Sequence, residues 1–286
     1  FDLAMEINRF RRLMEEKFKA KQSKEEIIKF INEYLYVDEN AANAIYQYFK
    51  EQYLYAEIGH DKKLLVEFFN LNDKKYIVFH SLYGRRVNDV LSRAIAFAIF
   101  RLQHKDVEIG INDNGFVIVT DEKLQVLKAF NLIKSSDLRK ILNLAIDKSE
   151  VLKRRFRHCA TRALMILRQY KGQKKGIGRQ QVSSMILMSA LKRISDDFCI
   201  LKEAKREVLE DLMDINNAAN VLKTIEEGKM EIKQLATSIP SPFAFNIALQ
   251  GYTDILNMED RAEFLKRMHN MVLAKIGKDI DFRKET

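Results

Sequence analysis

A chain of 286 residues that is 47% hydrophobic and 31% charged has the composition of a globular protein with a substantial core, which excludes a disordered chain. Its 49 basic and 40 acidic residues leave a net charge of +9, which favours a polyanionic partner. The longest apolar runs are far shorter than the ~20 residues of a membrane span, and no secretory signal is visible. We therefore expect a cytoplasmic protein with no membrane partner.

Residues 1–62 are predicted to form three helices, because apolar side chains recur at helical spacing in each of three segments. Asp2 and Asp38 are candidate N-caps, and Ser23 with Glu26 forms a capping box. Three short helices followed by extended segments are typical of part of a winged helix or of a helical packing module. The first residue is Phe rather than Met and opens directly into a helical pattern, which indicates a piece of a longer chain.

Residues 63–121 are predicted to form a small unit of strands and one helix. The helix is expected over residues 87–102, where apolar stripes overlap. Four runs rich in β-branched and aromatic residues flank it and are predicted strands: 64–69, 76–80, 107–111 and 116–120. Asn114-Gly115 between the last two is a strong hairpin signal. This order favours a small antiparallel sheet or partial barrel with one helix.

Residues 122–286 are predicted to form a helical bundle, helical almost to the end of the chain. Asp147 with Glu150 is a candidate cap for a long helix over 152–171, which glycines 172, 176 and 178 interrupt. Further helices are expected at 182–194, 202–213, 217–227 and 259–276. Ser241 is a candidate cap for a helix that begins at Pro242. The fold class is thus α+β, mainly helical, in three parts: 1–62, 63–121 and 122–286.

The positive charge is concentrated in one stretch. Residues 151–195 contain twelve Lys or Arg and no Asp or Glu. The rest of the chain holds 37 basic residues against all 40 acidic ones, so this stretch accounts for the entire net charge. A basic block on an otherwise balanced protein is typical of a protein that binds the phosphate backbone of a nucleic acid.

Placed on a helix, residues 152–171 separate into an apolar and a basic face. The apolar face comprises Leu152, Phe156, Cys159, Ala160, Ala163, Leu167 and Tyr170. We favour nucleic acid as the partner of the basic face. Two alternatives stay open: an acidic membrane surface, which the lack of a wide aromatic wedge disfavours, and acidic side chains of other helices, such as Glu203, Glu207, Glu210 and Asp211. Phe156, Tyr170 and Phe198 are able to stack on bases, although packing in the core is their more usual role.

Two further segments offer phosphate-binding groups. Residues 172–179 form a flexible basic loop without a P-loop or dinucleotide fingerprint, and either grip phosphate or simply connect two helices. Tyr83-Gly84-Arg85-Arg86 precedes a helix whose first N–H groups attract anions, unless it is a solvated turn. The candidate nucleic-acid-binding residues are Arg85, Arg86, Lys153, Arg154, Arg157, Arg162, Arg168, Lys171, Lys174, Lys175 and Arg179.

Catalytic and metal-binding patterns are weak in this sequence. Cys159 and Cys199 are forty positions apart and outside any CxxC motif, which argues against a disulfide framework and a zinc site. The five histidines never pair at metal-ligand spacing, and Asp196-Asp197 is more typical of a helix end than of a catalytic pair. We therefore expect no catalytic residue, metal or cofactor site in this chain.

Four segments together resemble a known family. Residues 155–165 (RFRHCATRALM) are similar to a helix of the large helicase-related (Lhr) proteins, and residues 83–88 (YGRRVN) to one of their turns. Residues 203–214 and 239–245 (IPSPFAF) resemble later segments of the same proteins. The four blocks occur in the family's order over roughly residues 80–275. Their sequences are most similar to those of archaeal members.

The resemblance implies the C-terminal, DEAD/DEAH-associated region of a superfamily 2 ATP-dependent helicase. Lhr proteins translocate on single-stranded DNA and act on DNA or RNA:DNA duplexes in repair or recombination. Their two RecA-like motor domains precede a winged helix and a C-terminal domain of barrel plus helical bundle. This chain contains neither GxxxxGK[ST] nor a DExH box, so ATP and Mg²⁺ would belong to the missing motor domains of the same polypeptide. Residues 1–60 would complete the winged-helix region or its junction.

We therefore expect a nucleic-acid-binding accessory region that grips the phosphate backbone while the motor domains translocate. Single-stranded or duplex DNA is the expected partner and an RNA:DNA hybrid is the alternative, and the chain alone is not expected to be catalytic. Two other classes stay open. The family's C-terminal domain resembles helical-wing DNA glycosylases, although no catalytic Asp can be assigned here. A protein-interaction scaffold would use the same cations against an acidic partner or its own motor.

Overall fold

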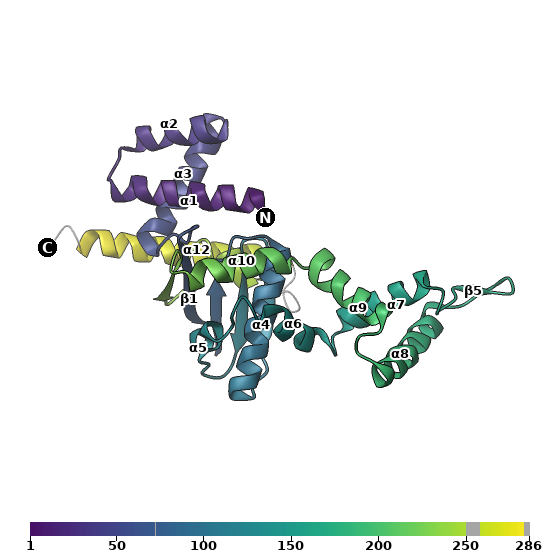
Figure 1. Ribbon diagram of the computed structural model, residues 1–286. Coiled ribbons are helices and arrows are strands. Elements are labelled where there is room, and N and C mark those ends of the chain that lie inside the picture. The colour runs from purple at the N-terminus through teal and green to yellow at the C-terminus, as the bar shows by residue number, and fades with distance from the viewer. Residues whose placement is uncertain (72, 250–257, 283–286) are drawn as a thin grey trace.

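The computed structural model describes residues 1–71, 73–249 and 258–282. Three helices, α1 (Asp2–Lys19), α2 (Lys24–Leu35) and α3 (Glu39–Tyr55), gather at one end of the molecule (Figure 1). The predicted capping box is confirmed, because Ser23 and Glu26 each accept a hydrogen bond from the other's backbone amide. Asp38 caps α3 as predicted, whereas Asp2 lies inside the first turn of α1, after the N-cap Phe1.

The described residues form a five-stranded sheet with the order β3-β4-β2-β1-β7. Its strands are β1 (Lys63–Leu71), β2 (Lys74–Phe79), β3 (Glu108–Asn112), β4 (Gly115–Thr120) and β7 (Glu231–Ala236). The first four pair antiparallel, with Phe79 opposite Phe116 in the β2–β4 ladder. The predicted hairpin at Asn114-Gly115 is confirmed as the connection between β3 and β4. The α+β, mainly helical fold class is confirmed.

Strand β7 corrects the prediction that the chain is helical from residue 122 almost to its end. It pairs in parallel with β1, which makes the sheet mixed rather than antiparallel. The pairing places Leu65 opposite Lys233, and β7 lies at the edge of the sheet with most of its side chains exposed. Its residues therefore lack the apolar alternation by which a half-buried strand is predicted from sequence. The pairing is also long-range, since Leu65 and Lys233 are 168 positions apart.

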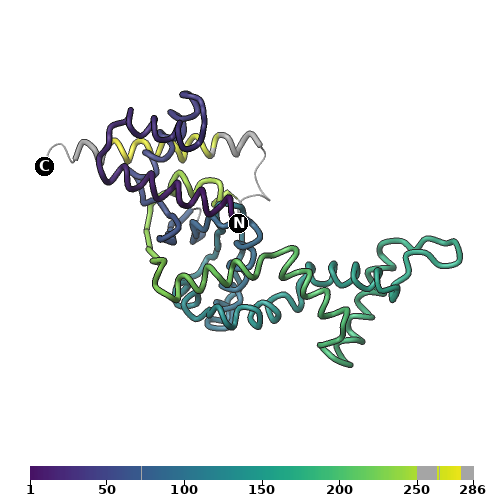
Figure 2. The backbone as a smooth tube through the Cα atoms, turned by 45° about the horizontal axis from the view of Figure 1, so that its top comes forward, coloured from purple at the N-terminus to yellow at the C-terminus, as the bar shows by residue number. Residues whose placement is uncertain are grey.

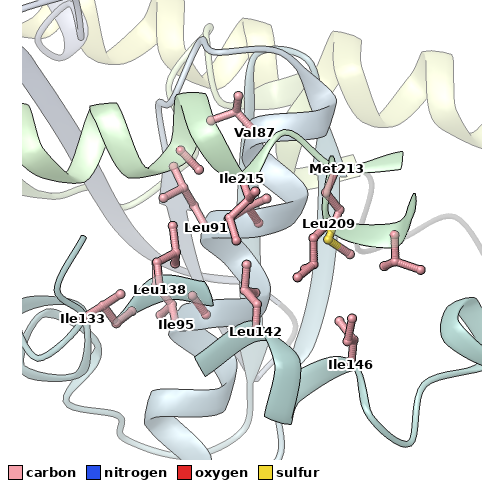
Figure 3. Packing of buried hydrophobic residues seen from close by; sticks show 14 of the residues in the cluster. Val87, Leu91, Ile95, Ile133, Leu138, Leu142, Ile146, Leu209, Met213 and Ile215 are labelled. Carbon is pink, nitrogen blue, oxygen red and sulfur yellow. The ribbon is translucent and has the colours of Figure 1, made fainter. Parts of the chain in front are cut away.

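The two faces of the sheet carry different helices. One face packs on α4 (Arg85–Gln103), which in turn contacts α5 (Val126–Asn131), α6 (Leu138–Ile146) and α10 (Ile215–Glu226). Figure 3 shows this core, in which Leu91 and Ile95 of α4 lie near Leu138 of α6 and Ile215 of α10. The opposite face packs on the short helix α11 (Phe245–Ala248). Helix α12 (Met258–Phe282) contacts α3.

Residues 150–212 form a projection that we call the arm. It comprises α7 (Glu150–Arg162), the two-stranded hairpin β5 (Gln169–Tyr170) and β6 (Gln173–Lys174), α8 (Ile177–Ile194), α9 (Cys199–Arg206) and the π-helix η1 (Glu207–Leu212). Figures 1 and 2 both show the arm extending away from the sheet, with the β5–β6 hairpin at its far end. Helix α7 packs against α8 and α9, and the buried side chains of the arm continue the hydrophobic core that contains α4.

The arm corrects two local predictions. Ser149 rather than Asp147 caps α7, because its hydroxyl accepts from the amide of Leu152 at 3.2 Å. The helix ends at Arg162 rather than continuing to residue 171. Leu164 there has a positive φ of 58°, and the amides of Leu164 and Met165 donate back to the carbonyls of Thr161 and Ala160 at 3.1 and 2.9 Å. This is a Schellman ending, which usually carries Gly at the position of Leu164 and so left no signal in the sequence.

The remaining predicted helices are present with shifted boundaries. Residues 182–194 belong to α8, which begins earlier than predicted, at Ile177. Gly176 is the N-cap of this helix, and Gly178 lies inside it rather than interrupting it. Residues 202–213 divide between α9 and η1, while 217–227 and 259–276 correspond to α10 and α12.

Candidate nucleic-acid interface

Helix α7 has the two faces that its sequence predicts. Leu152, Phe156 and Ala160 are completely buried, and Cys159 is nearly so. The other side of the helix carries the cations of the basic block, of which Arg154 is exposed and Lys153, Arg155 and Arg157 are half-buried. The apolar face fastens the helix to the arm, and the cations are left at the surface.

A groove of about 200 Å³ lies between α7 and α8. Lys153, Arg154 and Arg157 line it from α7, while Gln181, Ser184 and Met185 line it from α8. Glu150 also lines it and accepts from Lys153 Nζ at 2.6 Å. The groove thus combines three cations and one carboxylate with neutral hydrogen-bonding groups, and this excess of positive charge suits an anion such as a phosphate.

Nine of the eleven predicted residues form no ion pair with a carboxylate of the described residues, and seven of these nine lie in the arm. The seven are Arg154, Arg157, Arg168, Lys171, Lys174, Lys175 and Arg179. Five of these lie on the hairpin or beside it, between residues 168 and 179, and all five are exposed. The positive charge therefore runs from the groove to the tip of the arm.

The pKa of His158 reports this crowding of positive charge. Burial, and then the charges of Arg157, Arg155 and two further arginines, lower its pKa below the ordinary value of 6.5. A proton on this exposed imidazole would add a cation to a surface that already lacks neutralising carboxylates. The lowered pKa therefore favours the neutral form of His158.

A second carboxylate of the arm neutralises two further cations of the block. Glu207 in η1 is 3% exposed and accepts from Arg155 Nη1 at 3.3 Å and from Arg162. Burial alone would raise the pKa of Glu207, but the hydrogen bond and charge of Arg162, together with the charge of Arg155, hold it below 4.5. The alternative that the basic face pairs with acidic side chains of other helices thus applies to these two arginines. Arg162, a predicted nucleic-acid-binding residue, instead stabilises the packing of the arm.

Arg85 and Arg86 lie away from the groove, at the start of α4, and both bind carbonyl oxygens. Arg86 Nη2 donates to the carbonyls of Glu210 and Met213 at 2.6 and 3.1 Å, which ties the end of η1 to α4. Arg85 donates from Nη1 to the carbonyl of Ile111 at 3.4 Å. Gly84 precedes them with a φ of +85°, a conformation that L side chains rarely adopt. Binding of nucleic acid by this turn stays a prediction.

Sequence reasoning missed the contribution of α8 to the groove. Gln181, Ser184 and Met185 share one side of a helix, since they are spaced three and four residues apart, but nothing in the sequence indicates that this side faces α7. The structure also separates the three aromatic candidates. Phe156 is completely buried and Phe198 is half-buried against the core, whereas Tyr170 is 56% exposed at the tip of the hairpin.

Ser241, predicted to cap a helix, instead belongs to a buried polar cluster. Its hydroxyl donates to Glu67 Oε2 at 2.6 Å and its amide donates to Glu67 Oε1 at 2.7 Å. His80 Nε2 lies 2.8 Å from Oε2, and Thr237 donates to Oε1 at 2.9 Å. Glu67, His80 and Ser241 are each at most 3% exposed, so no substrate reaches them. The cluster holds residues 237–241 on the sheet.

Two absences concern the described residues alone. No group of three or more His, Cys, Asp or Glu side chains is arranged to hold a metal ion. No helix in this part of the chain is both long and apolar enough to cross a membrane.

The chain matches known proteins over most of its length. The model of the DEAD/H associated family matches residues 58–244. The ATP-dependent helicase Lhr-Core of Methanothermobacter thermautotrophicus is 52% identical over 277 residues, which cover 96% of this chain and 32% of that protein. The Lhr helicase/uracil glycosylase of Escherichia coli is 32% identical over 179 residues, or 62% of this chain and 11% of that protein. The chain thus spans about a third of the length of the Lhr-Core relatives.

A solved structure has the same fold. It is that of Mycobacterium smegmatis helicase Lhr bound to single-stranded DNA and AMP-PNP, with a TM-score of 0.68 and 24% identity. The match covers 77% of this chain and 29% of that one.

Proposed function

We propose that this chain, which belongs to the DEAD/H associated family of Lhr helicases, is the part of such a helicase that holds the nucleic acid while motor domains translocate. The observation that carries the proposal is the run of seven cations without a carboxylate partner, from the α7–α8 groove to the β5–β6 hairpin. The related helicase of M. smegmatis, bound to single-stranded DNA, supports the choice of partner.

The proposed mechanism is electrostatic. Each Lys or Arg that neutralises a phosphate releases condensed counterions, so the affinity does not depend on base sequence and falls with salt. With all seven cations on phosphates, the logarithm of the binding constant for a single strand would fall with the logarithm of the salt concentration with a slope of about −5. Because the cations contact only the backbone, duplex DNA and an RNA:DNA hybrid are further ligands of the same surface.

The proposed role of this chain also implies roles for the other domains of the helicase. In the whole polypeptide, RecA-like motor domains would bind ATP and Mg²⁺, and this region would keep the strand in place between their steps. The three parts predicted from the sequence, 1–62, 63–121 and 122–286, would be the end of a winged-helix region, the sheet unit and the helical bundle. The protein would act in the cytoplasm, in DNA repair.

Fluorescence anisotropy tests the proposal most directly. A labelled single-stranded oligonucleotide is titrated with the chain at several salt concentrations, and we expect binding that weakens steeply as salt is raised. Absence of binding at low salt would contradict the proposal, and would favour the scaffold alternative if the chain instead bound the motor domains.

A glycosylase activity is the second candidate, because the E. coli relative carries the name uracil glycosylase. Such chemistry needs a carboxylate beside a pocket for a flipped base. The open pocket between α7 and α9 contains Glu203, Glu207 and Asp211, but Arg162 and Arg206 form ion pairs with these carboxylates. Incubation with uracil-containing DNA followed by alkali tests it, and intact strands would exclude uracil as the substrate.

A further inference from the structure

The tip of the arm is a tight hairpin with an exposed aromatic ring. Strands β5 and β6 pair Gln169 with Lys174 and Tyr170 with Gln173, which leaves a two-residue turn, Lys171-Gly172. Both turn residues have positive φ angles, 48° and 78°, as a type I′ turn requires. This turn fixes the direction of the side chains next to it, so Tyr170 is presented by a defined backbone.

Tyr170 is the aromatic residue of the arm that shows its ring to solvent. Phe156 and Phe198, the other aromatic residues of the described arm apart from His158, are buried or half-buried. A ring that is 56% exposed at the end of a projection contributes little to the stability of the fold. Its position instead suits contact with a partner, because exposed Tyr rings are common anchors at binding surfaces.

One cation lies near the ring, and two more share its side of the hairpin. Lys171 Nζ lies 5.6 Å from its centroid. Side chains alternate along a strand, and the register places Arg168 and Lys175 on the same side of the hairpin as Tyr170, since Lys175 donates its amide to the carbonyl of Arg168 at 2.9 Å. No carboxylate of the described residues lies within 4.0 Å of any of these three cations.

An exposed aromatic ring among unpaired cations matches the chemistry of single-strand binding. Cations hold the backbone phosphates, and the ring stacks on a base whose face is free. In a duplex every base face is covered by its neighbours, so the same ring gains nothing there. We propose that Tyr170 stacks on an unpaired base and makes the hairpin selective for single strands over duplexes. This inference rests on the proposed function, which by itself predicts backbone contacts without that preference.

Substitution of Tyr170 tests the selectivity. We expect Tyr170→Ala to weaken binding of a single-stranded oligonucleotide by about 5- to 150-fold, the range for loss of one stacked base. Tyr170→Phe should keep the affinity within about twofold, since it keeps the ring. Binding of the matching duplex should change less than twofold in both variants, and the salt slope should stay the same, because no charge is removed.

A fluorescence measurement tests stacking itself. The chain contains no Trp, so Tyr170→Trp creates a single reporter at the tip. A single-stranded oligonucleotide should quench its emission, while a duplex of the same sequence should not. The matched control is Tyr36→Trp, at a position that is 93% exposed at the end of α2. Figure 1 shows α2 at the other end of the molecule from the arm. The emission of Tyr36→Trp should not change with either ligand.

The outcomes separate the two proposals. This inference would be overturned if Tyr170→Ala bound a single strand as tightly as the original chain and the strand did not quench Tyr170→Trp. The electrostatic function would then stay intact. Quenching of Tyr170→Trp by duplex as strongly as by single strand would also overturn it. Absence of binding of any strand by the original chain at low salt would overturn both. Circular dichroism of each variant checks that the fold is retained.

Discussion

Arg155 of α7 donates from Nη1 to Oε2 of Glu207 in η1 at 3.3 Å, across 52 positions of the chain. Arg162, two turns further along α7, binds the other oxygen of the same carboxylate. One acidic residue outside the basic block therefore anchors two of its cations, and the block divides into a part that stabilises the arm and a part that is free for a ligand.

Removal of the Glu207 charge should separate these two roles. Glu207→Gln should lower the free energy of unfolding by about 1–3 kcal/mol, the cost of losing charge-assisted hydrogen bonds at a site with little solvent. It should not weaken binding of single-stranded DNA, and should strengthen it slightly at low salt, because Arg155 and Arg162 gain free charge. Urea unfolding and anisotropy measure the two effects.

The control for this variant is Glu150→Gln. Glu150 also pairs with a cation of α7, Lys153, but its side chain is 81% exposed. Exposed ion pairs contribute little, so its loss should cost less than about 0.5 kcal/mol. Equal destabilisation by the two substitutions would show that the Glu207 contacts do not hold the arm together.

Ser241 offers a second test of a buried polar group. Ser241→Ala removes the hydroxyl that donates to Glu67 Oε2 at 2.6 Å and leaves a buried carboxylate with one partner fewer. We expect a loss of about 1–3 kcal/mol in the free energy of unfolding, with DNA binding unchanged. Ser238→Ala, three residues earlier on the exposed side of the segment, should cost less than about 0.5 kcal/mol.

The same cluster predicts how stability depends on pH. Burial alone would raise the pKa of Glu67, but hydrogen bonds from His80 and Ser241 and the charge of His80 hold it below 4.5. Because the folded-state pKa is lower than that of the unfolded chain, the contribution of Glu67 is complete above about pH 4.5 and is lost as the pH falls through the folded value. Unfolding curves between pH 7 and pH 3 should therefore show a steeper loss of stability for the original chain than for Glu67→Gln. Parallel pH profiles would contradict the assignment.

Local sequence signals predicted those parts of the fold that depend on neighbouring residues. The capping box of Ser23 and Glu26 and the hairpin turn at Gly115 need only a few adjacent residues, and both are present. Strand β7 was not predictable in this way, because its partner β1 precedes it by more than 160 positions and its exposed edge carries polar residues. The end of α7 was missed because a Leu occupies the left-handed position that usually holds Gly.

The candidate site was predicted as a charge pattern rather than as a geometry. The absence of Asp and Glu from residues 151–195 located the cations. Which of them are free depends on Glu207 and Asp147, which only the fold brings near. The α8 side of the groove depends in the same way on helix packing, for which no local pattern exists.

Three of the free arginines provide the sharpest test of the interface. Arg154 and Arg157 lie in the groove and Arg168 at the base of the hairpin, so Arg154→Ala/Arg157→Ala/Arg168→Ala removes charge from two parts of the proposed path. At 0.1 M salt each lost phosphate contact with a single strand is worth about fivefold, so the triple variant should bind about 100-fold more weakly. The salt slope should become less steep by about 2.

The control removes the same number of charges elsewhere. Arg9, Arg101 and Lys128 are exposed on α1, α4 and α5 and have no carboxylate within 4.0 Å among the described residues. Their joint replacement by Ala lowers the net charge equally but should leave both the affinity and the salt slope close to those of the original chain. If both triple variants lost affinity equally, the binding would follow net charge alone, and the path from the groove to the hairpin would be refuted. Weakening confined to the arm variant would assign the phosphate contacts to this path.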